Sequence, residues 1–320
     1  MRTLVYLTLV FPLAAAPLAR PVALRADPRR ATWLLTGAAV GLALSSAAAL
    51  GLLVVAVAVR LRPIARVAHL SVRLLERVDP TGGSVALVAA ALLGLALTAS
   101  LRFTVRRCRA IGQSFALARR LPGRGQVVVV DAAVAEAYAV PGKPGRIVVS
   151  SAMLNAVGFE GRAVVLAHER AHLRGHHWVF IAATSLAAVA NPLLRPFVPG
   201  VEYSVERWAD ESAVAEVGDR ALVARTVARA ALAAKATGAS ARMPAVLGIA
   251  GSRPVRQMLS SSAGPVPRRV AALLSPDLAW GRALLGLLGL LVVGAGFCAV
   301  EAARDLHIVF ELADKANLHR

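Results

Sequence analysis

The stretch that decides the fold is Val164-Val-Leu-Ala-His168-Glu169-Arg-Ala-His172-Leu-Arg-Gly-His176-His177. Its small and apolar residues favour a helix, on which residues four apart lie on one face. His168 and His172 are therefore expected to reach one zinc ion through ring nitrogens at about 2.0–2.1 Å. Glu169 projects beside them, close enough to take a proton from a zinc-bound water. The spacing predicts one Zn2+ per chain, with Glu169 as the general base.

A catalytic zinc site usually has three protein ligands and one open position. We favour Glu206 as the third ligand, because Asp210 follows it by one helical turn and shares its face. In this arrangement Glu206 binds the metal, while Asp210 accepts the second ring N–H of a ligand histidine and fixes its tautomer. The alternative interpretation is a solvated acidic face that also includes Glu202, Glu211 and Glu216.

Two further histidines, His176 and His177, are the rival third ligands. The run from His168 resembles the start of a metzincin motif, but the position of the third metzincin histidine holds Trp178. His176 lies two turns from His168, about 12 Å along a straight helix, which is too far for one metal ion. We therefore assign both histidines to the substrate side or to a polar helix end near the membrane.

The composition is that of a membrane protein. Over 320 residues the mean hydropathy is +0.63 and 57% of the residues are hydrophobic, above the ~45–50% of soluble domains. Four segments have the length of a membrane crossing, about 20 residues: 3–19, 33–59, 84–101 and 280–300. A shorter apolar run at 178–190 ends in a proline-rich turn and predicts a buried or membrane-dipping hairpin.

The net charge of +19 first suggests nucleic-acid binding. Aromatic residues make up only 5% of the chain, however, and no basic stripe with interleaved aromatics is present, so direct nucleic-acid binding is not predicted. The arginines at 20–30 and 102–109 fall on one side of the predicted spans, and the positive-inside rule places that side in the cytoplasm. The five arginines at 60–77 argue for the opposite orientation. We expect a multi-pass protein of the cell membrane with a cytoplasmic zinc domain.

Three regions follow from these features: three membrane helices with short basic loops at 1–101, a zinc metallopeptidase domain at 102–278, and a final span with a short tail at 279–320. In the middle region the pattern predicts strands at 126–130 and 146–150, a turn at 138–145, helices at 151–157, 160–190, 201–217 and 221–234, and a loose loop at 237–267. The predicted fold class is mainly α, a polytopic membrane protein with about four transmembrane helices. Its zinc domain is expected to be gluzincin-like, with helices plus a small β-hairpin or sheet.

Five blocks of this region resemble the membrane metallopeptidases of the β-lactam sensor-transducer family and, more distantly, the heat-shock and CAAX-prenyl membrane proteases. The blocks are Glu136–Gly142, Ile147–Leu154, Val165–His172, Glu206–Asp210 and Pro267–Leu274. The resemblance spans residues 120–277 and implies a zinc ion on His168, His172 and Glu206, with Glu169 as the catalytic base. It is a resemblance to the peptidase module without the penicillin-binding sensor, because only about twenty residues follow the last span.

The sequence thus predicts a membrane-bound zinc endopeptidase. We expect the substrate to be an extended protein or peptide segment that adds to an edge strand near 146–150, as in the cleavage of a cytosolic DNA-binding repressor. Tyr203, His176 and Arg207 are the candidates for stabilising the oxyanion. Alternatives are a quality-control protease for membrane proteins and a non-catalytic, zinc-stabilised membrane scaffold; Glu169 argues against the scaffold, because a structural zinc site needs no base.

Overall fold

The computed structural model describes residues 2–59, 83–123, 125–238, 265–275 and 281–318. Among these residues, four helical segments are long and apolar enough to cross a membrane: Thr3–Arg25, Pro28–Ala58, Gly83–Arg120 and Arg282–Leu312. The protein is mainly α-helical and also contains a small three-stranded sheet, so the predicted fold class is confirmed.

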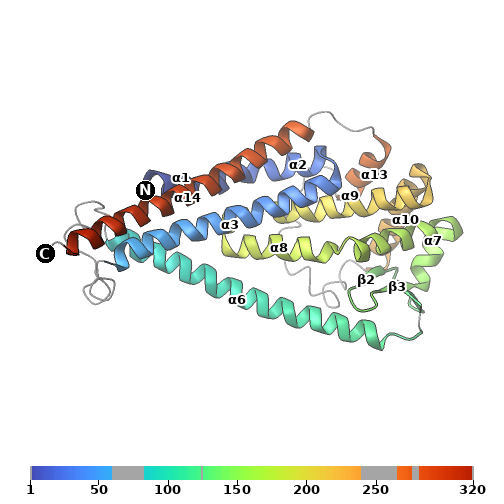
Figure 1. Ribbon diagram of the computed structural model, residues 1–320. Coiled ribbons are helices and arrows are strands. Elements are labelled where there is room, and N and C mark those ends of the chain that lie inside the picture. Colours follow the sequence, from blue (N-terminus) through green and yellow to red (C-terminus); the bar gives the residue numbers. More distant parts are fainter. Residues whose placement is uncertain (1, 60–82, 124, 239–264, 276–280, 319–320) are drawn as a thin grey trace.

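The spans form an elongated bundle. They consist of α1 (Arg2–Ala15), η1 (Ala16–Leu18) and α2 (Ala19–Arg25), then α3 (Pro28–Ala58), α6 (Gly83–Arg120) and α14 (Gly281–Leu318). Both termini lie at the end of the bundle away from the sheet (Figure 1). Asp27 caps α3, because its side chain accepts the backbone N–H of Arg30 at 2.9 Å and Pro28 occupies the first helical position. The corner between α2 and α3, where this cap lies, is at the same end of the bundle as the sheet (Figure 1).

The sheet contains β1 (Val127–Val130), β2 (Ala137–Val140) and β3 (Arg146–Ser150) in the order β1-β3-β2. β1 runs parallel to β3, and β2 runs antiparallel to it. Every residue of β3 is buried, as expected for a central strand; Ile147, Val148 and Val149 are β-branched, and the buried guanidinium of Arg146 donates to the carbonyls of Pro122 and Gly123.

Two predictions about the sheet are wrong. Residues 146–150 form the central strand, so their backbone is paired on both sides and cannot receive a substrate strand. The predicted turn at 138–145 begins too early, because Tyr138 and Val140 pair with β3 and extend β2 to Val140. The strand that lies beside α7 (Ser151–Arg174) and has a free edge among the described residues is β2.

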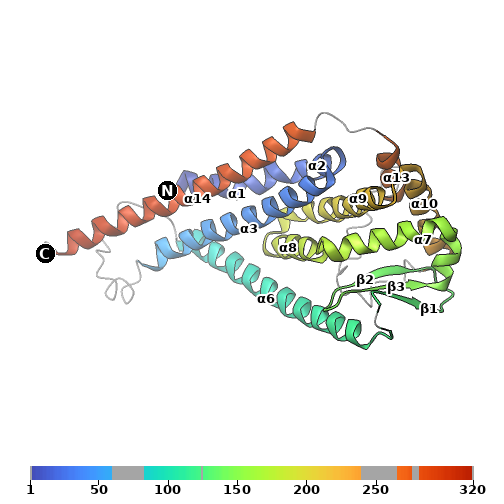
Figure 2. The ribbon, with the colours of Figure 1, turned by 45° about the vertical axis from the view of Figure 1, so that its right-hand side comes forward.

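We call the sheet and the helices around it the head. Its helices are α7, α8 (His177–Ala190), η2 (Pro192–Leu194), α9 (Phe197–Val217), α10 (Arg220–Ala236) and α13 (Pro265–Leu274). α7 lies against the sheet (Figure 2) and is kinked at Gly158, whose φ of 72° is readily adopted by glycine. The helix predicted at 160–190 is in fact two helices. It breaks at Gly175 and His176, and His176 adopts a left-handed φ of 47°.

The hairpin formed by α8 and α9 connects the head to the bundle, because both helices pack against the long helix α3. α8 packs against α3 and α6, and its Thr184 hydroxyl donates to the Thr36 hydroxyl at 3.2 Å. At its end the Asn191 side-chain amide donates to the Ser46 hydroxyl at 3.0 Å. Phe180, Phe197 and neighbouring residues join a core shared with α2 and α3. The short apolar run thus forms the first helix of a hairpin that packs against the spans.

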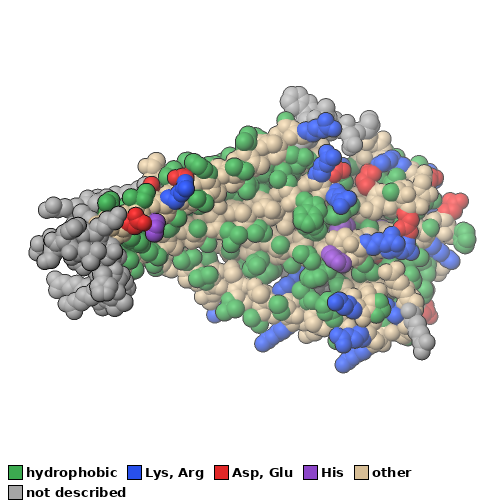
Figure 3. Space-filling model, in the orientation of Figure 1, with side chains coloured by type: hydrophobic (Ala, Val, Ile, Leu, Met, Phe, Trp, Pro, Cys, Tyr) green, Lys and Arg blue, Asp and Glu red, His purple; other side chains and the backbone are tan. Residues whose placement is uncertain are grey.

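Two boundaries predicted from the sequence differ from the structure. The boundary at residue 101 falls inside α6, which continues as one helix to Arg120. The predicted loop at 237–267 overlaps α13, and its residues 239–264 lie outside the described residues, as do the arginines at 60–77 and the start of the segment at 280–300. On the face shown in Figure 3, charged side chains gather mainly over the sheet and the helices around it, with a smaller group near the far end of the long helices, whose surface between the two is largely apolar. This distribution suits a bundle in lipid with a head in water.

Candidate metal centre

Two helices bring three candidate ligands together. His168 and His172 from α7 and Glu206 from α9 place their ligand atoms within 4.8 Å of one another. The two histidine Nε2 atoms are 3.2 Å apart, and each lies 3.7 Å from one oxygen of Glu206. Ligands at about 2.0–2.1 Å from one tetrahedral zinc lie roughly 3.3 Å apart. Donor types and spacing therefore fit a single zinc ion.

Asp210 lies behind this cluster. Its Oδ1 atom is 3.1 Å from Nδ1 of His168, on the side of the ring opposite Nε2, and its side chain is only 2% exposed. A proton held at Nδ1 by this carboxylate leaves the Nε2 lone pair free to face the metal position. The pairing of Glu206 and Asp210 on one helical face thus places one residue at the metal position and the other behind a ligand.

Sequence reasoning assigned no role to Arg269, which α13 brings to the same two carboxylates. Its Nε and Nη2 atoms donate to the two oxygens of Asp210 at 2.7 and 2.6 Å, and Nη1 lies 2.7 Å from Oε2 of Glu206. The forked geometry of the guanidinium suits this shared binding of two carboxylates. The signal was present, since Arg269 lies in the block Pro267–Leu274 that carried the family resemblance.

The cluster sets the charges of its own members. Burial opposes protonation of His168, but hydrogen bonds to Asp210 and Glu206 outweigh it and raise the pKa of His168 to about 10. Burial lowers the pKa of His172 to about 3, so this ring is neutral. The pKa of Glu206 is well below its usual value despite burial, because Arg269 and the histidines favour its charged form. The metal-free cluster therefore has one protonated and one neutral histidine.

Glu169 lies next to the ligands and is partly buried. Burial raises the pKa of its carboxyl group to about 7, although the charge of His168 and a hydrogen bond with the backbone of Ala139 in β2 act in the opposite direction. A carboxylate with a pKa near neutrality is suited to accept and return a proton at pH 7. The Ala139 contact also ties Glu169 to the edge strand of the sheet.

Zinc binding to the metal-free protein at pH 8 should release the proton of His168, because a zinc-bound imidazole is neutral at the coordinating nitrogen and this ring has a pKa of about 10. The apparent zinc affinity should rise by about tenfold per pH unit between pH 8 and 10. Calorimetry in two buffers with different ionisation enthalpies measures the number of protons released. Asp210→Asn, which removes the main partner of the charged ring, should release up to one proton fewer. Equal release by both proteins would contradict this assignment of charge.

The other predicted site residues lie in different environments. Tyr203 is half-buried on α9, one turn before Glu206, and burial raises the pKa of its hydroxyl group. Arg207 is buried, and its Nη1 atom donates to the carbonyls of Ala23 and Ala26 at 3.0 Å. Its guanidinium therefore anchors α9 to the end of α2, and its role as an oxyanion donor stays a prediction.

The two histidines after the motif have separate positions. His176 is exposed, and its Nδ1 atom is 2.8 Å from the carbonyl oxygen of Leu173, which closes the turn after α7. His177 is 1% exposed and lies against His172, so its assignment to a polar helix end or the substrate side is wrong. The break at Gly175 and His176 is the reason, because it interrupts the helical register and brings the His177 ring against His172.

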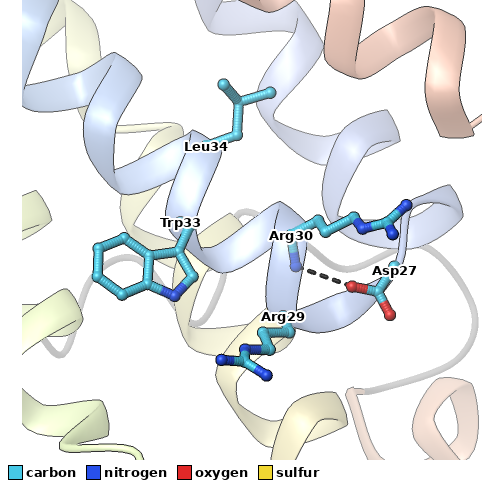
Figure 4. Close-up of a pocket in the computed structure, with 5 residues that line it drawn as sticks. All are labelled: Asp27, Arg29, Arg30, Trp33 and Leu34. Carbon is cyan, nitrogen blue, oxygen red and sulfur yellow. Dashed lines mark hydrogen bonds between the residues drawn. The ribbon is translucent and has the colours of Figure 1, made fainter.

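The metal cluster lies near the corner between α2 and α3, where the spans meet the head. A pocket at the start of α3 is lined by Asp27, Arg29, Arg30, Trp33 and Leu34 (Figure 4). The Arg29 guanidinium lies over the ring of Trp208, 5.6 Å from its centroid, and Trp208 follows Glu206 by two residues. Trp33 meets Phe180 edge to face at 4.8 Å. The metal cluster is therefore joined to the spans through α9.

Comparison with known proteins gives one match. No curated protein and no solved structure matches the chain. Residues 104–190 match the model of peptidase family M48, a stretch that includes His168, Glu169 and His172 and ends before Glu206. The match does not extend to the sensor-transducer family. Over the residues that form the sheet and carry the histidine motif, the chain is thus similar to peptidase family M48, which supports a metallopeptidase activity.

Proposed function

We propose that this protein is a membrane-bound zinc endopeptidase that hydrolyses peptide bonds in protein segments near the membrane surface. One observation carries the proposal: His168, His172 and Glu206 converge on a position that fits one zinc ion, with Glu169 beside them. The similarity to peptidase family M48 supports the same chemistry. A non-catalytic zinc scaffold would not need a carboxyl group such as Glu169, whose pKa burial raises to about 7, beside the metal position.

Zinc bound to the three ligands would supply a Lewis acid that polarises water and the scissile carbonyl. The Glu169 carboxylate takes a proton from the attacking water and later delivers it to the leaving amide nitrogen. Asp210 holds the proton on Nδ1 of His168, and Arg269 holds Asp210 and one oxygen of Glu206 in place. Tyr203, one turn from Glu206 on α9, is our candidate for donating a hydrogen bond to the oxyanion.

An extended substrate has one suitable strand to join. β2 is an edge strand of the sheet, and Ala139 within it contacts Glu169, so a peptide along β2 passes beside the base. Main-chain hydrogen bonds to an edge strand bind extended segments with little dependence on sequence. This placement supports an endopeptidase that selects substrates by their extended conformation.

The junction with the spans favours substrates at the membrane. Arg29 over Trp208 and Arg207 on the carbonyls of α2 hold the metal-bearing helix α9 against the membrane-facing corner. This contact favours quality-control cleavage of membrane proteins as the second candidate function. Regulatory cleavage of a cytosolic repressor stays a finer hypothesis within the same chemistry. Cleavage of a cytosolic repressor requires the zinc domain to lie in the cytoplasm, which is the side that we expect.

Comparative N-terminal proteomics of cells with the wild type or Glu169→Gln tests the proposal. We expect new protein N-termini that depend on Glu169. Termini near the ends of spans in many membrane proteins would support quality control, whereas one or a few termini in a soluble regulator would support signalling. Identical sets of termini, with purified wild-type protein that binds zinc but cleaves no unfolded membrane-protein substrate, would contradict a peptidase.

A further inference from the structure

The turn between α7 and α8 has an unusual construction. Gly175 ends α7, His176 adopts a left-handed conformation, and α8 then begins with His177. A left-handed residue that is not glycine is uncommon, and His176 is the only one among the described residues. This break interrupts the helical register between α7 and α8, and beyond it the His177 ring lies against His172.

His177 meets a metal ligand directly. Its Nδ1 atom lies 3.0 Å from Nδ1 of His172, and the two rings are nearly perpendicular, with centroids 4.9 Å apart. His172 presents its other nitrogen, Nε2, to His168 and Glu206. The contact is therefore made on the side of the His172 ring that faces away from the metal position.

The proton between these rings has one arrangement that is compatible with metal binding. A neutral His172 that coordinates through Nε2 must carry its proton on Nδ1. This N–H then donates to Nδ1 of His177, which must be unprotonated, so a neutral His177 carries its proton on Nε2. The two rings form an ordered N–H···N hydrogen bond.

We propose that His177 is a positioning residue, whose Nδ1 atom accepts the Nδ1 proton of His172 and so fixes the tautomer and ring orientation of this metal ligand. The inference rests on the metal site of the proposed function. It gives the two ligand histidines different supports, a carboxylate behind His168 and a neutral imidazole behind His172. A neutral acceptor holds the ring without adding a second negative charge to a cluster that already contains Glu206 and Asp210.

The surroundings of His177 are specific to this arrangement. Its Nε2 atom is buried and has no hydrogen-bond partner in the described part of the chain. A Cβ atom at Gly175 would lie 2.4 Å from Nε2, so glycine is needed there for the ring to fit. Trp208 covers the ring with centroids 4.6 Å apart. An orphaned buried N–H is unfavourable, and an ordinary core position would hold an apolar side chain instead.

Two substitutions separate positioning from packing. His177→Asn keeps an acceptor near the place of Nδ1 but loses volume, whereas His177→Leu keeps apolar packing against Trp208 and removes the acceptor. If His177 positions His172, the leucine variant should bind zinc about 10–100-fold more weakly than the wild type, and the asparagine variant should stay within about threefold. If His177 only packs, asparagine should lower the Tm more than leucine, and both should bind zinc like the wild type.

The experiment uses the full chain in detergent, with zinc affinity from chelator competition and Tm of the metal-free form as a folding control. His176→Asn, which keeps a residue tolerant of the left-handed conformation, should leave zinc affinity unchanged. In addition, 15N-labelled histidine in the zinc-loaded wild type reports the tautomers by NMR and does not depend on a variant that folds. A proton on Nε2 of His177 supports the proposal. A proton on Nδ1 of His177, or normal zinc affinity in His177→Leu, overturns it while the peptidase assignment stands; a wild type that binds no zinc overturns both.

Discussion

Glu169→Gln should lower kcat by about 10²–10⁴-fold and leave zinc binding nearly unchanged. The amide has almost the same shape as the carboxyl group and can still accept a hydrogen bond, so the metal position keeps its geometry. It cannot take a proton from water, and the proton needed by the leaving amine is then missing. The loss should therefore appear in kcat, with KM changed little, because Glu169 acts in the chemical step. Steady-state cleavage of a quenched peptide by the purified protein, together with zinc content by mass spectrometry, measures both effects.

Glu160→Gln is the matched control for this substitution. It makes the same chemical change on the same helix, α7, at an exposed position away from the metal cluster. Its activity should stay near that of the wild type. Retention of more than about a tenth of the wild-type kcat by Glu169→Gln, with zinc bound, would rule out Glu169 as the general base.

Arg269→Gln should destabilise the metal-free protein by about 3 kcal/mol, the low end of the range for removing one partner of a buried ion pair. Asp210, only 2% exposed, loses two charge-assisted hydrogen bonds and keeps one cationic partner, His168. Glu206 also loses Arg269, but its side chain is 39% exposed, so water compensates for part of that loss. The expected decrease in Tm is roughly 6–12 °C, from about 2–4 °C per kcal/mol for a folded domain of roughly 150–250 residues.

Zinc should restore part of the stability of Arg269→Gln, because a bound cation replaces the lost positive charge beside Glu206 and because binding stabilises the folded state by mass action. Thermal unfolding with and without zinc measures this difference. Arg229→Gln, an exposed arginine on the neighbouring helix α10, is the control and should change stability by less than about 0.5 kcal/mol. A metal-free Arg269→Gln as stable as this control would show that the contacts of Arg269 with the carboxylates do not hold α13 and α9 together.

The part of the candidate site that lies on α7 could be predicted because its residues are neighbours on one helix. The four-residue spacing of His168 and His172 gives a common face on any regular helix, with Glu169 next to it. The same reasoning pairs Glu206 with Asp210 on α9. The spans could be predicted as well, since runs of about 20 apolar residues have few alternatives to crossing a membrane. In each case the periodicity of one helix or the composition of one segment was sufficient.

Predictions failed where the chain departs from a regular element or where distant elements meet. On an unbroken helix His177, five residues after His172, would lie on a different face, and the break at Gly175 and His176 brings the two rings into contact. Arg207 was predicted only as a candidate for stabilising the oxyanion, and its buried guanidinium donates to the carbonyls of Ala23 and Ala26 at the end of α2. The strand expected at the sheet edge is central, because strand order depends on which backbone partners the whole fold supplies.

The sequence by itself predicted the long apolar helices, the residue types of the candidate metal ligands and the candidate base. Tertiary structure decided which partners those residues have. Packing of α7 against α9 brings Glu206 to the histidines, and α13 delivers Arg269 to Asp210 across 59 positions of sequence. The physical reason is that coordination and proton transfer need particular side chains, which the sequence displays. The hydrogen bonds that orient those side chains need atoms within about 3 Å, a proximity that only the packed chain creates.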